Sequence, residues 1–409
     1  MGKSTHFSGQ PLYSQVIKFM SKDRILQLSR EHGGERYIKR FDCWTHLVVM
    51  LYAVIMRFDS LREIAASLQG EARKLSHLGI SMMPSRSTLS DANSRRPDTV
   101  FEAIYRDLYV RYRDRLSSDS RSNKEPSWLK QLRIIDSTTI TLFSNLIFKG
   151  VGRHPKTGRK KGGIKAHTVI HANEGVPSDV RFTSAATNDS FMLKPASLDK
   201  GEVLAIDRAY IDYEKFEELT ERGVVYVTKM KKNLKYAILS DTMYQTPDGL
   251  MEVRIQHVTF TKELKGNETL IHHARIITYA DERKHKLVRL LTNDMESDPS
   301  EIIAIYRKRW EIELLFKQIK QNFPLKYFYG ESANAIKIQI WVTLIANLLL
   351  TLMKKGLTRP WSFSGLATMV RTMLMYYVDF YSLFNHPERD WEAILKAASE
   401  EPPQLELFT

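Results

Sequence analysis

The apolar residues of this chain change their spacing near residue 120, and this change limits the folds that the chain can adopt. Before residue 120 they recur every three to four positions, which is the pattern of amphipathic helices. After it, short runs rich in β-branched residues alternate with turns and helical patterns, which is typical of a mixed α/β unit. The sequence therefore predicts a helical N-terminal region followed by an α/β region. The N-terminal helices are expected at residues 12–19, 24–29, 44–57, 60–66 and 100–112, with a short polar helix between Pro84 and Pro97.

The α/β region is expected to contain a sheet and a β-rich insertion. Asn173 and Gly175 mark a hairpin turn between two of its strands. Alternating segments within residues 230–297 indicate the insertion, and Asp298 or Ser300 is expected to cap the long helix that follows. The expected strands lie at 132–142, 164–171, 176–183, 203–206, 224–228, 252–260, 274–279 and 286–292, with helices at 213–221 and from 298 to about 398.

Two runs of apolar strand residues end directly before an aspartate, Asp136 and Asp207. A carboxylate in this place is held rigidly at a sheet edge, where its oxygens suit a hard divalent cation. One such aspartate is a weak signal, because most aspartates are exposed and only solvated. Two of them, with a glutamate from a packed helix, would share two cations about 3.5–4 Å apart, which suits in-line attack at phosphorus.

The long helix carries a third acid, Glu313, together with Tyr306, Arg309 and Lys320. Since each helical residue turns by about 100°, these four side chains are expected within a stripe of about 60°. Two cations, a phenol and a carboxylate on one narrow face are costly to bury. They are suited to a phosphate group and a metal ion.

Other acids and histidines near these residues are expected to have no catalytic role. Glu311 lies on the other side of the same helix and is expected to face solvent, and Asp212 and Asp189 fit a helix start and a loop acid. His167 and His171 lie on one face of one strand. A zinc site is one interpretation of these histidines, but a third ligand with suitable spacing is lacking, and core or DNA contacts are the alternative.

The chain is strongly basic, with a formal net charge of +14 and a pI of about 9.5, so a polyanion is the first partner to consider. Residues 149–165 contain seven lysines and arginines and no acid. Within this run Arg159, Lys160, Lys161 and Lys165 are expected to contact DNA, and a solvated loop is the alternative. The same two interpretations stay open for the lysines at 229–232 and for the polar helix before Pro97.

Several other classes of protein are disfavoured. The single cysteine, Cys43, excludes an internal disulfide and cysteine-based zinc sites. The first residues lack the apolar core of a signal peptide. Two apolar stretches, residues 46–58 and 336–353, are expected to be buried helices, because the first is too short to span a bilayer and the second contains polar residues. We therefore expect a cytoplasmic protein without a membrane partner.

The acids and the helical stripe together resemble a known family. Asp136, Asp207 and Glu313, with the signature Tyr-x2-Arg-x3-Glu-x6-Lys at Tyr306 to Lys320, resemble the DDE transposases of bacterial insertion sequences, specifically the IS-four family. The segment from Asp207 to Tyr210 resembles that family's Asp-x-Gly/Ala-Phe/Tyr motif, and residues 162–167, 175–177 and 188–189 also match its pattern. The resemblance covers roughly residues 130–350.

This resemblance implies a fold and an activity. The fold would be a ribonuclease H-like catalytic core at 126–325 with its β-rich insertion at about 230–297, after a helical DNA-binding domain at 1–125 and before a helical region at 326–409. The activity would be cut-and-paste transposition with Mg²⁺, which Mn²⁺ replaces, on terminal inverted repeats and target DNA. A homodimer would act in the synaptic complex, at the bacterial nucleoid. Asp136, Asp207 and Glu313 would bind the metals, and Tyr306, Arg309, Lys320 and Tyr210 would contact DNA.

The sequence departs from the family in one respect, and two alternatives stay open. Relatives that use a hairpin intermediate stack a flipped base on a tryptophan of the insertion, but residues 230–297 contain none. Tyr236, Tyr244, Phe260 or Tyr279 would have to replace it. The alternatives are a ribonuclease H-like DNA endonuclease without strand transfer and a domesticated, non-catalytic DNA-binding protein. The second is expected to have lost an acid, whereas this chain keeps all three.

Overall fold

The computed structural model describes residues 9–117, 126–141, 163–185, 187, 189–245, 252–264, 266, 268–281 and 285–400. The chain forms two compact units, one of residues Met1–Tyr112 with Ile319–Thr409 and one of residues Arg113–Gln318. The first unit thus combines both ends of the chain. The three-domain division that the sequence suggests stays a prediction.

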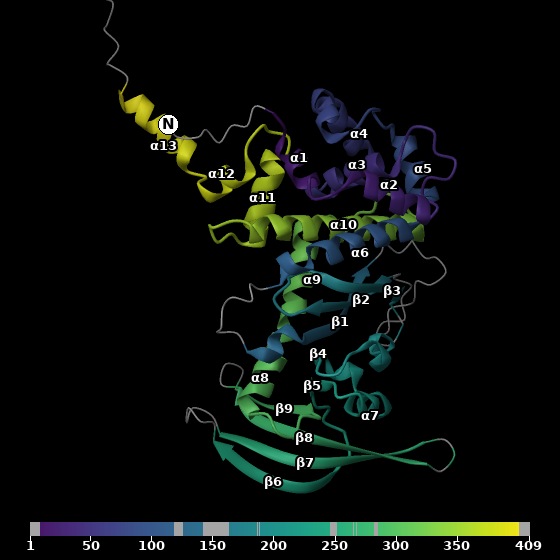
Figure 1. The fold of residues 1–409 in the computed structure, drawn as a ribbon, viewed down its shortest axis with the longest axis vertical. Helices are drawn as coiled ribbons and strands as arrows, with labels where there is room; N and C mark the ends of the chain where they lie inside the picture. The colour runs from purple at the N-terminus through teal and green to yellow at the C-terminus, as the bar shows by residue number, and fades with distance from the viewer. Residues whose placement is uncertain are drawn as a thin grey trace, which may run out of the picture. The chain divides into compact units, whose positions relative to one another are not determined.

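The first unit is helical, as predicted, and its helices are drawn in Figure 1 in purple to blue and in green to yellow. The helices are α1 (Leu12–Ile17), α2 (Lys22–Glu31), α3 (Cys43–Met56), α4 (Leu61–Gly70), α5 (Arg86–Arg95), α6 (Asp98–Leu116), α10 (Ala333–Lys355), α11 (Phe363–Met373), α12 (Phe380–Asn385) and α13 (Arg389–Glu400), with a 3-10 turn, η1 (Ala72–Leu78). Helices α3 and α10 are almost wholly apolar and pack against each other in the core.

The short polar helix predicted before Pro97 is α5. Its N-cap is Ser85, whose hydroxyl accepts a hydrogen bond from the backbone N–H of Thr88 at 3.2 Å. The helix buries Leu89, Ala92 and Asn93. Arg96, directly after it, is also buried and donates to the backbone carbonyls of Gly34 and Phe41 in the same unit. This cation therefore stabilises the fold of the first unit.

Helix α10 accounts for the longer of the two apolar stretches. By length and composition it is the one helix among the described residues that would be able to cross a membrane, but 94% of its most apolar window is buried inside the structure. Its central polar residues, Gln339, Thr343 and Asn347, are buried as well. This agrees with the predicted buried helix.

The second unit is built around one mixed sheet of nine strands. The strands are β1 (Leu132–Thr141), β2 (Gly163–His171), β3 (Pro177–Ser184), β4 (Val203–Ile206), β5 (Val225–Lys229), β6 (Ala237–Gln245), β7 (Glu252–Glu263), β8 (Thr269–Asp281) and β9 (Lys286–Thr292). The helices are α7 (Tyr213–Glu221), α8 (Pro299–Lys308) and α9 (Trp310–Asn322), and the 3-10 turns are η2 (Ser127–Lys130), η3 (Asp189–Met192), η4 (Pro195–Ser197) and η5 (Arg208–Tyr210). Helix α9 ends in the first unit.

The strand order is β3-β2-β1-β4-β5-β9-β8-β7-β6 (Figure 1). Strands β3, β2 and β1 pair antiparallel, whereas β1, β4 and β5 pair parallel. This arrangement of the first five strands is that of a ribonuclease H-like core, as the resemblance implies. The predicted turn between β2 and β3 is present, with Asn173 and Gly175 in the left-handed region at φ of 67° and 71°.

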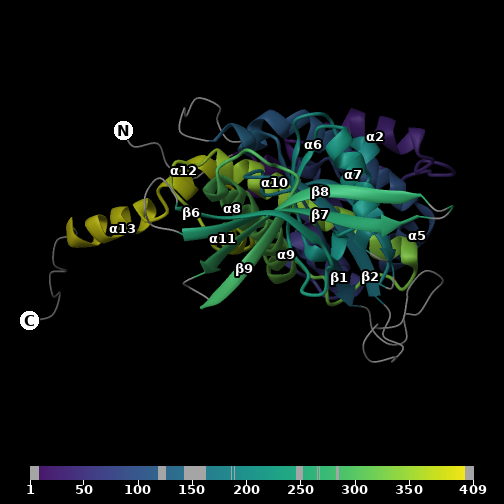
Figure 2. The same cartoon turned by 90° about the horizontal axis from the view of Figure 1, so that it is seen from below.

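The β-rich insertion is present and extends the core sheet. Strand β9 pairs antiparallel with β5, and β8, β7 and β6 follow it (Figure 2). Strand β6 was not predicted. It is the edge strand, its residues are exposed except for Tyr244, and its sequence lacks an alternating apolar pattern.

The two faces of the core sheet have different coverings. Ile135 of β1 and Ile206 of β4 belong to a buried cluster with Phe216 of α7. Helix α8 packs against β4, β5 and β9, and every residue of β4 is buried. Since successive side chains of a strand point to opposite faces, the residues after Ile135 and Ile206 are directed away from the α7 cluster.

Candidate active site

Asp136 and Asp207 lie side by side in the middle of the sheet. Strands β1 and β4 are parallel and adjacent, and Ile135 pairs with Ile206 in their register. The residues that follow, Asp136 and Asp207, therefore occupy equivalent positions on neighbouring strands, about 5 Å apart in the hydrogen-bonding direction. Asp207 also caps η5, because its carboxylate accepts from the backbone N–H of Ala209 at 2.9 Å.

The predicted long helix is two helices, and this corrects the sequence interpretation. Helix α8 is capped by Asp298, whose carboxylate accepts from the backbone N–H of Ser300 at 2.8 Å. It ends at Lys308, and α9 begins at Trp310. The residue between them, Arg309, donates its N–H to the carbonyl of Tyr306 at 3.1 Å, which is the tighter 3-10 pattern. The proposed stripe thus crosses a helix junction.

Arg309 connects the acid on β1 to the acid on α9. Its guanidinium donates to the carboxylate of Asp136 at 3.4 Å and forms a short ion pair with Glu313. The Arg309 side chain is only 13% exposed. Three acids that are far apart in the sequence therefore lie around one another, two by strand register and the third through a shared guanidinium.

Burial raises the pKa of the Asp136 carboxyl from 3.8 to about 6. The backbone N–H of Ser137, which donates to Asp136 Oδ1 at 2.7 Å, and the Arg309 cation both lower this pKa, whereas the charges of Asp207 and Glu313 raise it. A carboxyl with a raised pKa among like charges is typical of a functional site.

Tyr306 and Lys320 complete the predicted set. The Tyr306 ring lies 5.8 Å from the Arg309 guanidinium carbon, and burial raises the pKa of its hydroxyl, with a further contribution from Asp207. Lys320 follows Glu313 by two helical turns on α9 and belongs to the first unit. Burial lowers the pKa of Lys320.

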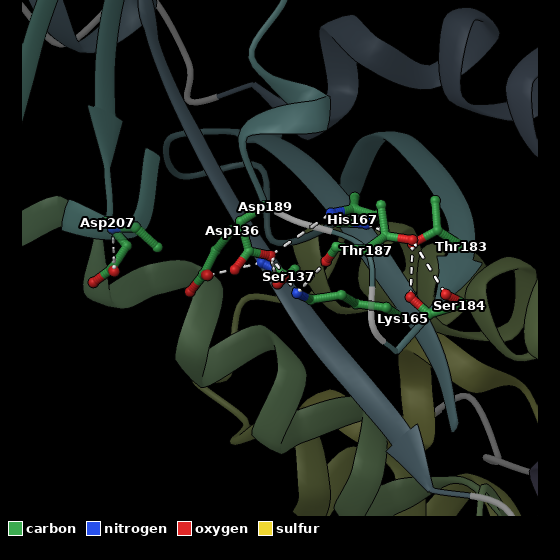
Figure 3. A network of polar contacts seen from close by, with 10 residues as sticks. Asp136, Ser137, Lys165, His167, Thr183, Ser184, Thr187, Asp189 and Asp207 are labelled. Atoms are coloured by element: carbon green, nitrogen blue, oxygen red, sulfur yellow. Dashed lines mark hydrogen bonds and ion pairs between the residues drawn. The ribbon is translucent and has the colours of Figure 1, made fainter. Parts of the chain in front are cut away.

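A second group of polar residues is connected to Asp136 through Ser137 (Figure 3). The hydroxyl of Ser137 donates to Asp189 Oδ1 at 2.5 Å, and the ammonium of Lys165 lies 2.8 Å from the same oxygen. Lys165 also donates to the carbonyl of Thr187 at 3.0 Å. His167 is buried beside this group, with Nδ1 3.9 Å from Asp189 and Nε2 2.7 Å from the hydroxyl of Thr183.

Several predicted DNA contacts change in the light of these positions. Tyr210 is fully buried, and burial raises the pKa of its hydroxyl, followed by the charges of Asp189, Asp136 and Asp207. We therefore leave Tyr210 out of the DNA contacts, because its side chain has no exposed surface. Lys165 is 14% exposed and paired with Asp189, so its charge is already balanced. Arg159, Lys160 and Lys161 lie outside the described residues and stay predictions.

Glu311 does not simply face solvent, as the sequence suggested. Its carboxylate accepts from the backbone N–H of Asn173 at 2.9 Å and from the ammonium of Lys308 at 2.8 Å. Lys308 donates to the side-chain oxygen of Asn173 at 2.9 Å as well. Glu311 thus attaches the α8–α9 junction to the β2–β3 turn.

The donor chemistry of the three acids fits Mg²⁺, because carboxylate oxygens are the ligands that this ion prefers. In the part of the chain that the structure describes, no group of three His, Cys, Asp or Glu side chains is arranged to hold an ion as it stands. For the acids, Arg309 lies between Asp136 and Glu313. Of the two histidines, His167 lies in the core, and burial lowers the pKa of His171 to about 4. These positions do not support the interpretation of the two histidines as zinc ligands.

A ribonuclease H-like sheet with two aspartates on adjacent strands and a glutamate on a following helix defines a class, that of DDE-type proteins. Residues 127–349 match the family described as Transposase DDE domain, which is more than half of the chain. The chain belongs to this family. Residues 8–81 match a second family, described only as a domain of unknown function (DUF4372).

Individual relatives agree with this assignment. The chain is 29% identical over 269 residues to the inferred transposase y4zB of Sinorhizobium fredii, a match that covers 66% of this chain and 71% of that protein. It is 26% identical over 276 residues to the inferred transposase of insertion sequence element IS4SA from Synechocystis, covering 65% and 71%. The resemblance to insertion-sequence transposases of the IS-four type is therefore confirmed.

A solved structure is also similar over most of the chain. It is the piggyBac transposase in a synaptic complex with hairpin DNA, with a TM-score of 0.44 and 11% sequence identity, covering 97% of this chain and 86% of that one.

Proposed function

We propose that this protein cuts DNA at the ends of an insertion sequence and joins the freed 3′ ends to target DNA. The observation that carries the proposal is that Asp207 lies beside Asp136 by strand register, while Arg309 joins Asp136 to Glu313. Hydrolysis of a phosphodiester and transfer of a 3′ hydroxyl to a new phosphodiester are both in-line substitutions at phosphorus. One site of this composition therefore serves both steps.

Asp136, Asp207 and Glu313 would hold two Mg²⁺ ions, which Mn²⁺ would replace. When bound, the ions activate the attacking oxygen and stabilise the leaving oxygen. The chain's own residues set where this occurs: the two aspartates are fixed by strand register, and Glu313 is placed by the α8–α9 junction. Arg309 offsets part of the repulsion among the acids and, with Tyr306 and Lys320, would contact phosphates beside the scissile bond.

The proposed substrate is double-stranded DNA, as the terminal inverted repeats and the target. The basic residues Arg159, Lys160 and Lys161 would contact its backbone, and two copies of the chain would hold two element ends together. These partners, and action at the bacterial nucleoid in the cytoplasm, are supported by the family membership and by the net charge of +14.

The exposure of the aromatic side chains reduces the number of residues that would be able to stack a flipped base. Phe260 and Tyr279 are buried in the core, at 1% and 4% exposure, so the expectation that either stacks a flipped base is wrong. Tyr236 and Tyr244 are half-buried and stay candidates. Trp310, which no sequence pattern marked as a stacking residue, is 53% exposed and directly follows Arg309, and an exposed ring there suits stacking.

Two glutamates on α9 provide the test of the site. Glu313→Gln is expected to reduce cleavage of terminal-repeat DNA by at least about a thousandfold, because it removes a proposed metal ligand, while binding of the repeat persists. Glu311→Gln is the matched control, because it changes the same group two residues away and keeps an oxygen acceptor for Asn173. It should cleave nearly as well as the wild type at 25 °C. An equal loss in both variants would contradict the assignment of the site.

A strand-transfer assay separates transposition from simple cleavage. A repeat end labelled next to its free 3′ hydroxyl is incubated with a supercoiled plasmid and Mg²⁺. The proposal expects label in the plasmid, and this product should be lost in Glu313→Gln. Cleavage without transfer would instead favour the endonuclease alternative.

A further inference from the structure

We propose that Asp189 is a positioning residue that supports the metal-binding aspartate Asp136 from the opposite face of the sheet. The proposal rests on the proposed function, because it assigns Asp136 to the metal site. Asp189 acts in it through Ser137, and Lys165 holds Asp189 in place (Figure 3).

Ser137 has contacts on both sides of β1. Its backbone N–H donates to the carboxylate of Asp136 at 2.7 Å, and its hydroxyl donates to Asp189 at 2.5 Å. Asp136 and Ser137 are consecutive in β1, so their side chains leave the strand on opposite faces. The hydrogen bond of the Ser137 hydroxyl to Asp189 therefore fixes the position of the backbone between Asp136 and Ser137.

The contact falls where the pairing of β1 with β4 ends. The last paired residues are Ile135 and Ile206, so the register stops one residue before Asp136. On the other side β2 continues, with His167 opposite Ser137 and Lys165 opposite Thr139. Outside the sheet, the carboxylate of Asp189, at the start of η3, accepts the hydrogen bond of the Ser137 hydroxyl.

Lys165 explains why Asp189 keeps its place. Its ammonium contacts the same carboxylate oxygen that accepts from Ser137, and the carbonyl of Thr187 holds the ammonium from a second direction. Both side chains are mostly buried, at 14% exposure for Lys165 and 24% for Asp189. This is a charge-assisted contact with little freedom to shift. It is the arrangement by which outer residues orient a metal ligand.

The arrangement predicts a loss of metal affinity that does not need DNA or turnover to be seen. Removal of an outer partner of a metal ligand typically costs about 10–100-fold in affinity. Asp189→Ala and Ser137→Ala should each weaken Mn²⁺ binding by about tenfold or more. Both substitutions remove the same contact between Ser137 and Asp189. The double variant should therefore bind Mn²⁺ with an affinity no lower than that of the single variant that binds it more weakly. Asp189→Asn keeps an oxygen for Ser137 and should bind Mn²⁺ nearly as the wild type does.

The experiment measures Mn²⁺ binding to the full-length protein without DNA, by the free-ion signal in electron paramagnetic resonance. Asp179→Ala is the matched control, because Asp179 is a partly exposed, ion-paired aspartate on β3, outside the Ser137 contact. It should leave the affinity unchanged. Melting temperatures of the metal-free variants check folding, and Ser137→Ala, which removes a single oxygen, decides the matter if Asp189→Ala does not fold.

The outcomes separate the two proposals. Unchanged Mn²⁺ affinity in Asp189→Ala, or in Ser137→Ala where the former does not fold, overturns the positioning role while the metal site stands. So does an Asn variant that is as weak as the Ala variant, since Asp189 would then itself be a ligand, and so does additivity in the double variant. If the wild type binds no Mn²⁺, or Glu313→Gln binds it as well as the wild type does, the proposed metal site fails and the positioning role fails with it.

Discussion

At the scale of single residues, the grouping of three acids lowers the stability of the folded protein. Asp136 is half-buried next to two other acids, and Arg309 offsets only part of their repulsion, because the pKa of Asp136 is still raised from 3.8 to about 6. A carboxylate held in such a place destabilises the folded protein until a cation arrives. This is a general property of sites in which burial and like charges raise a carboxyl pKa.

Asp136→Asn is therefore expected to stabilise the protein at pH 7.5 in the presence of a chelator. Protonated Asp136 favours the folded state, so its contribution is fully favourable below the unfolded pKa and is lost as the pH rises through about 6. From about 1.4 kcal/mol per pKa unit, the free energy of unfolding should rise by about 2–3 kcal/mol in the variant. Denaturant unfolding at pH 7.5 and at pH 4.5 measures this, and the gain should shrink at pH 4.5.

The same variant makes a second observation possible. Mg²⁺ should raise the melting temperature of the wild type, because a ligand that binds only the folded state stabilises it. It should have a much smaller effect on Asp136→Asn. A variant that is less stable than the wild type at pH 7.5, with the same response to Mg²⁺, would show that Asp136 is an ordinary structural acid.

At the scale of elements, the junction between α8 and α9 determines where Glu313 lies. The helix is interrupted at Arg309, and on either side of it Lys308 and Glu311 attach the junction to Asn173 in the β2–β3 turn. The attachment links the start of α9 to the turn after strand β2, and β2 pairs with the strand that contains Asp136. It explains why a glutamate outside the proposed metal site is only partly exposed.

Glu311→Ala is expected to lower the free energy of unfolding by about 1–3 kcal/mol, because the N–H of Asn173 and the Lys308 ammonium both lose their acceptor. Glu311→Gln should cost less, since one oxygen remains. Glu214→Ala, which breaks an exposed ion pair with Lys262, is the control and should cost no more than about 1 kcal/mol. Thermal unfolding monitors all three. Equal stability of Glu311→Ala and the wild type would show that the contacts of Glu311 do not contribute to the free energy of unfolding.

Elements with a strong local pattern were predictable from the sequence, and those that depend on distant partners were not. Helix α7 and strand β9 have the predicted bounds, because an amphipathic helix and an apolar strand show in a few consecutive residues. Strand β6 is exposed at the sheet edge, so no apolar alternation marks it. The break at Arg309 falls inside a continuous helical pattern, and no proline or glycine announces it.

The site was partly predictable for the same reason. Asp136 and Asp207 follow runs of apolar strand residues, and Glu313 belongs to a spaced signature, so the sequence marks all three. Asp189 was interpreted as a loop acid, because its contact with Ser137 depends on the path of a loop and not on a strand pattern. Tyr210 carries a motif, but a motif does not tell a buried tyrosine from a DNA contact.

At the scale of the whole molecule, the net charge of +14 is too large to leave unexplained by a partner. Many of the described lysines and arginines are already paired with acids, such as Arg254 with Asp241, Lys262 with Glu214 and Arg359 with Glu388. The acid-free run at residues 149–165 has no such pairs within its own sequence. Apart from Lys165, which pairs with Asp189, its charges are the ones expected to replace cations around the DNA backbone.

Binding of repeat DNA should weaken steeply with salt, with a log–log slope of about −0.9 for each phosphate contacted. If Arg159, Lys160 and Lys161 each contact a phosphate, changing all three to glutamine should make this slope shallower by up to about 3. The matched control changes Arg254, Lys262 and Arg359 to glutamine, which removes the same total charge from cations already paired with acids. Fluorescence anisotropy over a series of salt concentrations measures both slopes.

The control should keep the wild-type slope, because its cations are balanced within the protein. Equal flattening in the two triple variants would mean that net charge alone, and not the basic run, attracts the DNA, whereas a flat wild-type response would remove the basis for phosphate contacts by the run.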